Sequence, residues 1–88
     1  MATVAIKLKI MPSSPDEDLE KIQTNLKQNL ESKNALNISF EQEPVAFGLK
    51  AIIATFAWPE EQDTSELESL SIEGINSSQI IDYRRAVG

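Results

Sequence analysis

The side chains that could do chemistry in this chain are carboxylates, amines and guanidinium groups, because the sequence contains no Cys and no His. Disulfides, thiolate nucleophiles, imidazole bases and the usual zinc and copper sites are thereby excluded. Acid–base or metal chemistry would need carboxylates that converge in a cleft with shifted pKa values. The candidate pairs instead fall at expected helix starts and on solvated faces, so we expect no catalytic, metal or cofactor site; these pairs are Glu17/Glu20, Glu60/Glu61 and Asp63/Glu66.

The basic side chains form two groups that could contact a partner. Lys7 and Lys9 alternate with apolar residues near the start of the chain, and Arg84 and Arg85 stand near its end. A guanidinium group can bind phosphate or carboxylate through two hydrogen bonds. The alternative for both groups is a solubilising strand surface. The net charge of −6 argues against a nucleic-acid binder held by phosphate contacts.

Two repeating patterns predict the first two elements. Strict alternation predicts a strand from Thr3 to Met11 with one buried face. A helix follows, for which Ser14 is the expected cap, Pro15 the first position and Glu17 the partner in a Ser-x-x-Glu capping box. Its narrow apolar stripe consists of Leu19, Ile22, Leu26 and Leu30, and it ends at Ser32-Lys33-Asn34.

The second half repeats this plan. A strand is expected over Leu36–Glu43 with Leu36, Ile38 and Phe40 on one face, and a strand over Leu49–Trp58 is apolar on both faces, which is typical of a central strand. The cap signature Asp63–Glu66 predicts a shorter helix bearing Leu67 and Leu70, ended by Gly74. The last strand is expected over Ile80–Arg85, and adjacent Ile80 and Ile81 must point oppositely unless a bulge intervenes.

The order β-α-β-β-α-β predicts an α+β fold, a ferredoxin-like sandwich formed by residues 1–88 as a single domain. Its four-stranded antiparallel sheet would have the order 4-1-3-2, with two helices on one face. Lys7 and Lys9, together with Lys50, are expected to form a basic stripe on the face that the helices leave open.

The connection Glu43–Leu49 is unusual because it carries apolar side chains at a chain reversal. Pro44 fixes φ and Gly48 can adopt a positive φ, while Val45 and Phe47 lie between them. Either Phe47 folds back to cap the core, or it is displayed to a partner. For Trp58 and Tyr83 we expect packing rather than contact.

Known families of this topology can be tested by their signatures. An RNA-recognition motif needs aromatic residues on the first strand, and copper-chaperone domains need a Cys pair, so neither fits. A small-ligand-sensing or protein-assembly module of the same fold stays open. The sequence shows no signal-peptide pattern and no apolar run of membrane-spanning length, so the cytoplasm is the expected location.

Four stretches of the chain resemble the archaeal translation elongation factor 1-beta family, which is similar to the C-terminal exchange domain of the eukaryotic factor. The resemblance extends over essentially the whole chain. The stretches are Ile10-Met11-Pro12 with Ser14-Pro15-Asp16, then Glu43–Leu49, Ser71-Ile72-Glu73-Gly74-Ile75 and Asp82-Tyr83-Arg84-Arg85.

This resemblance implies a guanine nucleotide exchange factor that binds the GDP form of elongation factor 1-alpha, speeds GDP release and makes or breaks no bond. In eukaryotic relatives, a loop aromatic that matches Phe47 contacts a β-barrel domain of the GTPase, and Pro44 and Val45 flank it here. The C-terminal end of those relatives lies near the magnesium site and carries a Lys at the next-to-last position. This sequence ends Arg84-Arg85-Ala86-Val87-Gly88, so Arg84 or Arg85 is expected to take that role.

The predicted sheet supports a two-point contact independently of the resemblance. The connection that carries Phe47 and the chain end that carries Arg84 and Arg85 lie at opposite ends of the strands. Strands of about ten residues at ~3.3 Å per residue separate these points by roughly 30 Å. A monomer could therefore touch two domains of one partner.

Overall fold

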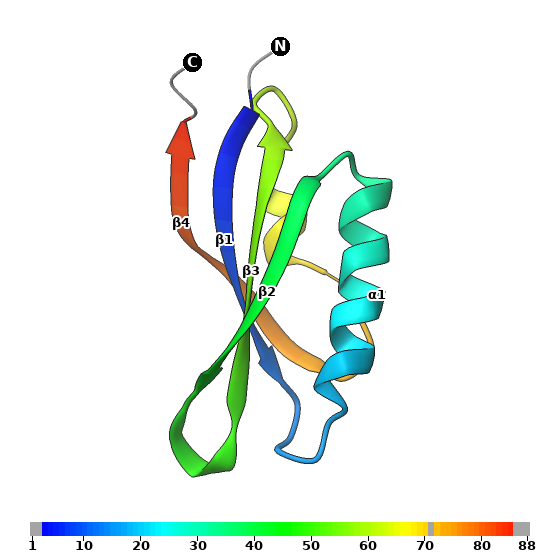
Figure 1. Cartoon of the computed structure of the whole chain (residues 1–88), viewed down its shortest axis with the longest axis vertical. Helices are drawn as coiled ribbons and strands as arrows, with labels where there is room; N and C mark the ends of the chain where they lie inside the picture. The colour runs from blue at the N-terminus through cyan, green and yellow to red at the C-terminus, as the bar shows by residue number, and fades with distance from the viewer. Residues whose placement is uncertain (1–2, 71, 86–88) are drawn as a thin grey trace.

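The computed structural model describes residues 3–70 and 72–85. Four strands form one antiparallel sheet in the order β2-β3-β1-β4, which is β4-β1-β3-β2 when counted from the other edge. The fold is α+β, with one α-helix beside the sheet (Figure 1). The elements are β1 (Thr3–Pro12), α1 (Leu19–Ser32), β2 (Leu36–Pro44), the 3-10 helix η1 (Ala46–Gly48), β3 (Lys50–Pro59), the 3-10 helix η2 (Ser65–Glu68) and β4 (Ile75–Arg85).

The core lies between the central strands and α1. Alternate residues of β1 and β3 face each other across the ladder and are buried, as in the pairs Val4–Trp58 and Ile6–Phe56. Trp58 is fully buried and meets Phe56 edge-on with 5.9 Å between ring centroids, so the packing role predicted for Trp58 is confirmed. Tyr83, for which packing was also expected, is half exposed and lies outside the core. The helix covers this face with Ile22, Leu26 and Leu30.

The start of α1 differs from the predicted capping box. The helix begins at Leu19, and its cap is Asp18, whose Oδ1 accepts hydrogen bonds from the backbone N–H groups of Glu20 and Lys21. Ser14 caps no α-helix because residues 14–17 form a separate turn, in which the Glu17 N–H donates to the Ser14 carbonyl at 3.3 Å. A bond from the Ser13 N–H to the Gly74 carbonyl, 2.8 Å long, joins this segment to the entry of β4.

The predicted second helix is wrong, since η2 is a single 3-10 turn over Ser65–Glu68. Leu67 alone among its residues is buried, and one turn suffices to place it in the core. Short helices are marginal in water, and Ser69 after the turn is a poor helix former. Ser71 lies outside the described residues, as do residues 86–88, which follow the predicted contact residues Arg84 and Arg85.

Both outer strands carry a β-bulge. In β4, Asp82 lies opposite Lys7 and Ile80 opposite Leu8, so Ile81 is the extra residue. Ile80 therefore packs on the core while Ile81 is exposed. A bulge thus does occur at the two adjacent isoleucines whose directions the sequence left open.

The bulge in β2 overturns a predicted face. Leu36 lies opposite Ala57 and Ser39 opposite Thr55, which leaves one residue extra beside Asn37 at φ 56°. Leu36 was expected on the same face as Phe40, but the bulge turns it away from the core, and its exposed fraction is 58%. Alternation fails here because it assumes an unbroken ladder.

No helix among the described residues is long and apolar enough to cross a membrane.

Candidate partner-binding surface

Phe47 stands at the tip of the β2–β3 hairpin, and 94% of its surface is exposed. It adopts φ 62° and ψ 33°, and Gly48 follows at φ 77°. Leu49 N–H donates to the Ala46 carbonyl, and Val45 N–H donates to the Leu49 carbonyl. Positive φ at both central residues is the mark of a type I′ turn, which matches the twist of a hairpin. The interpretation that Phe47 caps the core is therefore wrong.

The aromatic residue is costly at this position. A left-handed backbone costs a non-glycine residue about 1–2 kcal/mol, and type I′ turns favour Asn, Asp or Gly. Neighbouring Pro44 is exposed and Val45 half-buried, so the tip presents a small apolar surface around Phe47. Strain held at an exposed aromatic residue points to a contact role rather than a folding role.

Arg84 and Arg85 lie at the end of β4 and point to opposite faces of the sheet. Arg84 is opposite Ala5 on the open face, whereas Arg85 is opposite Val4 on the helix-covered face. Arg84 Nε lies 3.1 Å from Asp82 Oδ2, and Arg85 pairs with the Glu60 carboxylate. Both guanidinium groups remain largely exposed, and exposed ion pairs contribute little free energy. Either group can therefore exchange its partner.

Lys7 and Lys9 lie on the open face, as predicted. Lys7 is opposite Thr55 and Asp82, and Lys9 is opposite Ile53. Lys7, Thr55, Asp82 and Arg84 line a shallow hollow of about 190 Å³. The open face thus gathers cations from β1 and from the end of β4.

The predicted basic stripe needs two corrections. Lys50 is opposite Pro44 and shares the side of Ile52, so it lies on the helix-covered face. Glu41 and Glu43 project from β2 on the open face, opposite Ile53 and Ala51. The open face therefore carries cations along β1 with carboxylates beside them.

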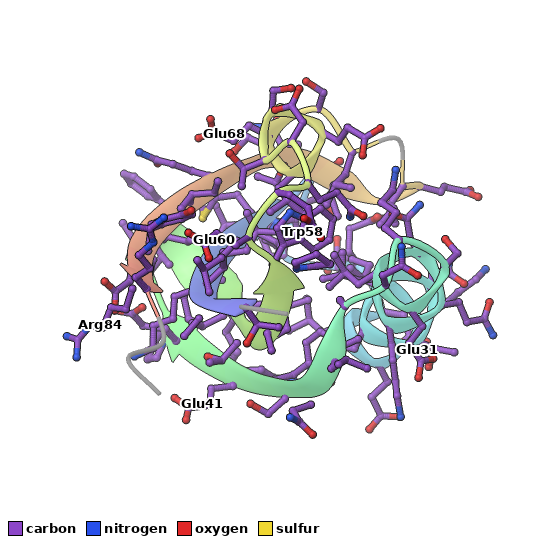
Figure 2. The ribbon with its side chains drawn as sticks, turned by 90° about the horizontal axis from the view of Figure 1, so that it is seen from above. Glu31, Glu41, Trp58, Glu60, Glu68 and Arg84 are labelled. Atoms are coloured by element: carbon purple, nitrogen blue, oxygen red, sulfur yellow. The ribbon has the colours of Figure 1, made fainter. Side chains whose placement is uncertain are left out.

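The hairpin tip and the end of β4 lie at opposite ends of the molecule, whose longest extent is 41 Å (Figure 1). The view along this axis shows Arg84 and Glu31 on opposite sides of the end that holds the β4 terminus (Figure 2). Phe47 and the arginines are therefore far enough apart to reach separate domains of a partner.

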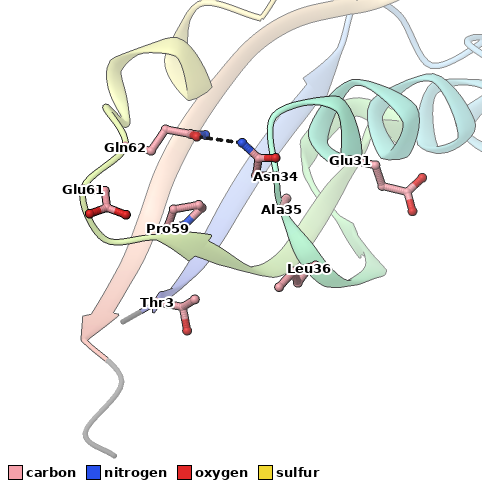
Figure 3. A pocket seen from close by; sticks show the side chains of 8 residues that line it. All are labelled: Thr3, Glu31, Asn34, Ala35, Leu36, Pro59, Glu61 and Gln62. Carbon is pink, nitrogen blue, oxygen red and sulfur yellow. Dashed lines mark hydrogen bonds between the residues drawn. The ribbon is translucent and has the colours of Figure 1, made fainter. Parts of the chain in front are cut away.

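Sequence reasoning missed a groove at the same end as Arg84. This end groove has a volume of about 770 Å³. Its lining comes from the start of β1, from the stretch between the end of α1 and the start of β2, and from the end of β3 with the loop after it (Figure 3). No local pattern could reveal it, because its apolar floor depends on the bulge beside Asn37. The lining residues are Thr3, Glu31, Asn34, Ala35, Leu36, Pro59, Glu61 and Gln62.

Within residues 3–70 and 72–85, no cluster of three or more carboxylate, imidazole or thiol side chains is arranged to hold a metal ion. The described surface consists of displayed side chains rather than a convergent acid–base set. It is suited to contact with another macromolecule.

Comparison with known proteins agrees with this geometry. The model of the EF-1 guanine nucleotide exchange domain matches residues 5–85. The chain is 36% identical to elongation factor 1-beta of Methanosarcina mazei over 88 residues, which cover 97% of this chain and 99% of the relative. It is 36% identical to elongation factor 1-beta of Metallosphaera sedula over 89 residues, with 97% of each chain covered. With the protein of the same name from Methanothermobacter thermautotrophicus, it shares 34% identity over 88 residues, which cover 97% of this chain and 98% of the relative. The chain belongs to the EF-1 guanine nucleotide exchange domain family and serves guanine nucleotide exchange in translation elongation.

Proposed function

We propose that this chain binds elongation factor 1-alpha in its GDP form and accelerates the release of GDP, so that GTP can replace it. It does so as a monomeric ferredoxin-like domain in the cytoplasm, with η2 in place of the second helix. It makes and breaks no bond and contacts neither nucleic acid nor membrane. The net charge of −6 accords with a protein partner rather than a phosphate backbone.

The observation that carries this proposal is Phe47, displayed at the hairpin tip on a strained and hydrogen-bonded turn. A rigid exposed aromatic residue loses little conformational entropy on binding, and such residues dominate the energetics of protein interfaces. Pro44 and Val45 form the adjoining part of this first contact. The family match supplies the kind of partner.

The second contact is formed at the other end by Arg84 and Arg85, with Lys7 and Lys9 on the open face. A guanidinium group beside the magnesium site of the GTPase would compete with Mg²⁺ for carboxylate and phosphate oxygens. The two contacts together would favour the nucleotide-free state of the partner. Linkage then requires that nucleotide weakens binding of the exchange factor by the same factor.

Release of fluorescent GDP from elongation factor 1-alpha of the same organism tests the proposal. The chain should raise the release rate in proportion to its concentration until the GTPase is saturated. It should also bind the nucleotide-free GTPase more tightly than the GDP form. An unchanged release rate would remove the exchange mechanism and leave a small-ligand-sensing or assembly module as the alternative.

A further inference from the structure

The end groove is an apolar depression with a polar rim. Its floor contains Ala35, Leu36 and Pro59, and Figure 3 shows Glu61 and Glu31 on opposite sides of them. Its volume of about 770 Å³ falls within the ~300–1,000 Å³ typical of binding pockets. It is large enough for several side chains.

The groove floor is exposed because of local backbone conformation. Asn34 at φ 73° and Asn37 at φ 56° flank Ala35 and Leu36, and both are left-handed residues. The bulge beside Asn37 turns Leu36 outward, as its partner Ala57 on the open face shows. An exposed leucine in a groove gains free energy when a partner covers it.

One wall of the groove is held in place by Gln62. Its amide group accepts from Asn34 Nδ2 at 3.3 Å (Figure 3). The same amide donates to the Lys33 carbonyl, and the Gln62 backbone carbonyl accepts from buried Trp58 Nε1. These bonds join the end of α1 to the loop after β3. The groove is therefore preformed, which lowers the entropy lost on binding.

The groove is continuous with the proposed contact of Arg84. Leu36, Ala57, Ala5 and Arg84 are successive partners across all four strands, so they form one row on the open face. Three strand spacings of ~4.8 Å put the ends of this row about 14 Å apart. The two residues between are alanines, so a partner that reaches Arg84 can lie flat over the row and enter the groove.

The charge of the rim indicates the chemistry of the occupant. Glu31 and Glu61 are both exposed, and neither forms an ion pair within the described part of the chain. Two free carboxylates around an aliphatic floor match a basic side chain whose methylene stem lies on Leu36 and Pro59. An acidic or phosphorylated segment would be repelled.

We propose that the end groove binds a segment of the elongation GTPase in which a Lys or Arg stands beside aliphatic side chains. This inference rests on the proposed function, since the GTPase is the partner that Arg84 would approach. It adds a third contact and gives the exchange factor a way to select its own GTPase by charge.

Site-directed crosslinking tests the occupant directly, because the native chain has no Cys. Leu36→Cys carries a photoreactive label into the groove, and Gln28→Cys places the same label on the exposed side of α1 as the control. In the complex with nucleotide-free GTPase, the Leu36→Cys label should attach to a GTPase peptide that contains Lys or Arg, and the control label should not. Attachment to a second copy of this chain, or to no GTPase peptide, would overturn the proposal.

Charge variants measure how much the rim carboxylates contribute to the affinity for the GTPase. The double variant Glu31→Gln, Glu61→Gln should weaken binding to the nucleotide-free GTPase, by up to about fivefold for each exposed carboxylate. The loss should shrink at high salt. Glu20→Gln removes the same charge from the exposed first turn of α1, outside the groove and away from the open face, and should leave the affinity unchanged.

The outcomes separate this inference from the proposed function. If the wild-type chain accelerates GDP release but the double variant binds as tightly as Glu20→Gln, the groove inference fails and the exchange function stands. If the wild-type chain does not accelerate GDP release, the proposed function itself fails. A mass that rises with concentration in light scattering, and returns to that of a monomer in Leu36→Ser, would assign the groove to a second copy.

Discussion

Val45 and Leu49 are joined by a main-chain hydrogen bond of 2.7 Å across the base of the turn that carries Phe47. This bond closes the hairpin without any help from the phenyl ring, which is 94% exposed. The conformation of the tip and the identity of its aromatic side chain can therefore be changed separately. This separation underlies the first two predictions.

Replacing Phe47 by Ala should lower the rate of GDP release at a fixed, subsaturating concentration of the exchange factor by about tenfold or more, because an anchoring aromatic residue is lost from the interface. The free energy of unfolding should stay within ~0.5 kcal/mol of wild type, as is usual for exposed positions. Fluorescent-GDP release and urea denaturation measure the two quantities. A large loss of stability would mean that Phe47 packs in solution.

Phe47→Asn should separate folding from function more sharply. Asn tolerates the left-handed backbone, so the variant should gain up to ~1 kcal/mol of stability, or roughly 4–8 °C in Tm for a domain of this size. Its exchange activity should nevertheless fall as in Phe47→Ala. A variant with unchanged Tm would show that the turn is not strained.

Arg84→Ala and Arg85→Ala should each slow GDP release, and the double variant should lose at least about fivefold, which corresponds to ~1 kcal/mol of activation free energy. Excess Mg²⁺ should suppress the activity of wild type, and the double variant should have lost this sensitivity. Lys27→Ala, which removes a cation from the exposed surface of α1, is the matched control. Full activity in the double variant would exclude competition with the metal.

Asp63 should titrate below its ordinary pKa of 3.8, because the backbone N–H of Ser65 donates to its carboxylate at 2.9 Å. A lowered pKa in the folded state means that the charged carboxylate contributes stability above the unfolded pKa, and that this contribution is lost as the pH falls below 3.8. NMR titration of the carboxyl carbon measures the pKa directly. Asp63→Asn should remove that part of the acid dependence, and a normal pKa would show that the bond to Ser65 is open.

Gly74 and Gly48 both have positive φ but differ in their surroundings. A Cβ at Gly74 would lie 2.6 Å from Glu17 Oε2 and 3.3 Å from Ile22 Cδ1, whereas a Cβ at Gly48 would meet nothing within 4 Å. Gly48→Ala should therefore cost only the backbone penalty of about 1 kcal/mol. Gly74→Ala should cost more, since buried Ile22 must also shift. Equal losses in urea denaturation would contradict this difference.

Sequence patterns predicted the strands well because alternation reflects burial directly. The range predicted for β1 ends one residue short of Pro12, and the doubly apolar third strand lies mid-sheet, as its composition indicated. The helix-cap pattern failed where contacts between distant parts of the chain accompany the local conformation. Asp18 replaces Ser14 as the helix cap, because residues 14–17 form a separate turn, and the adjoining Ser13 is bonded to Gly74, far away in sequence.

The candidate site was predictable only in part. The residues around Phe47 marked an unusual turn, but sequence alone could not choose between display and burial, because both place an apolar residue at a reversal. Lys50 was assigned to the wrong face, although its alternation with Ala51 carried the information. No sequence pattern indicated the end groove, because alternation predicts Leu36 to be a core residue and does not predict the bulge beside Asn37.

That bulge has a consequence for the edge of the sheet. The outer strands β2 and β4 are the places where another chain could add a strand, and irregularities interrupt both, one in β2 and two in β4. An unbroken outer strand next to an exposed Leu36 would be a template for edge-to-edge aggregation. The irregularity that exposes Leu36 thus also interrupts the edge of the sheet beside it, which is one of the ways that proteins disfavour pairing of an outer strand with another chain.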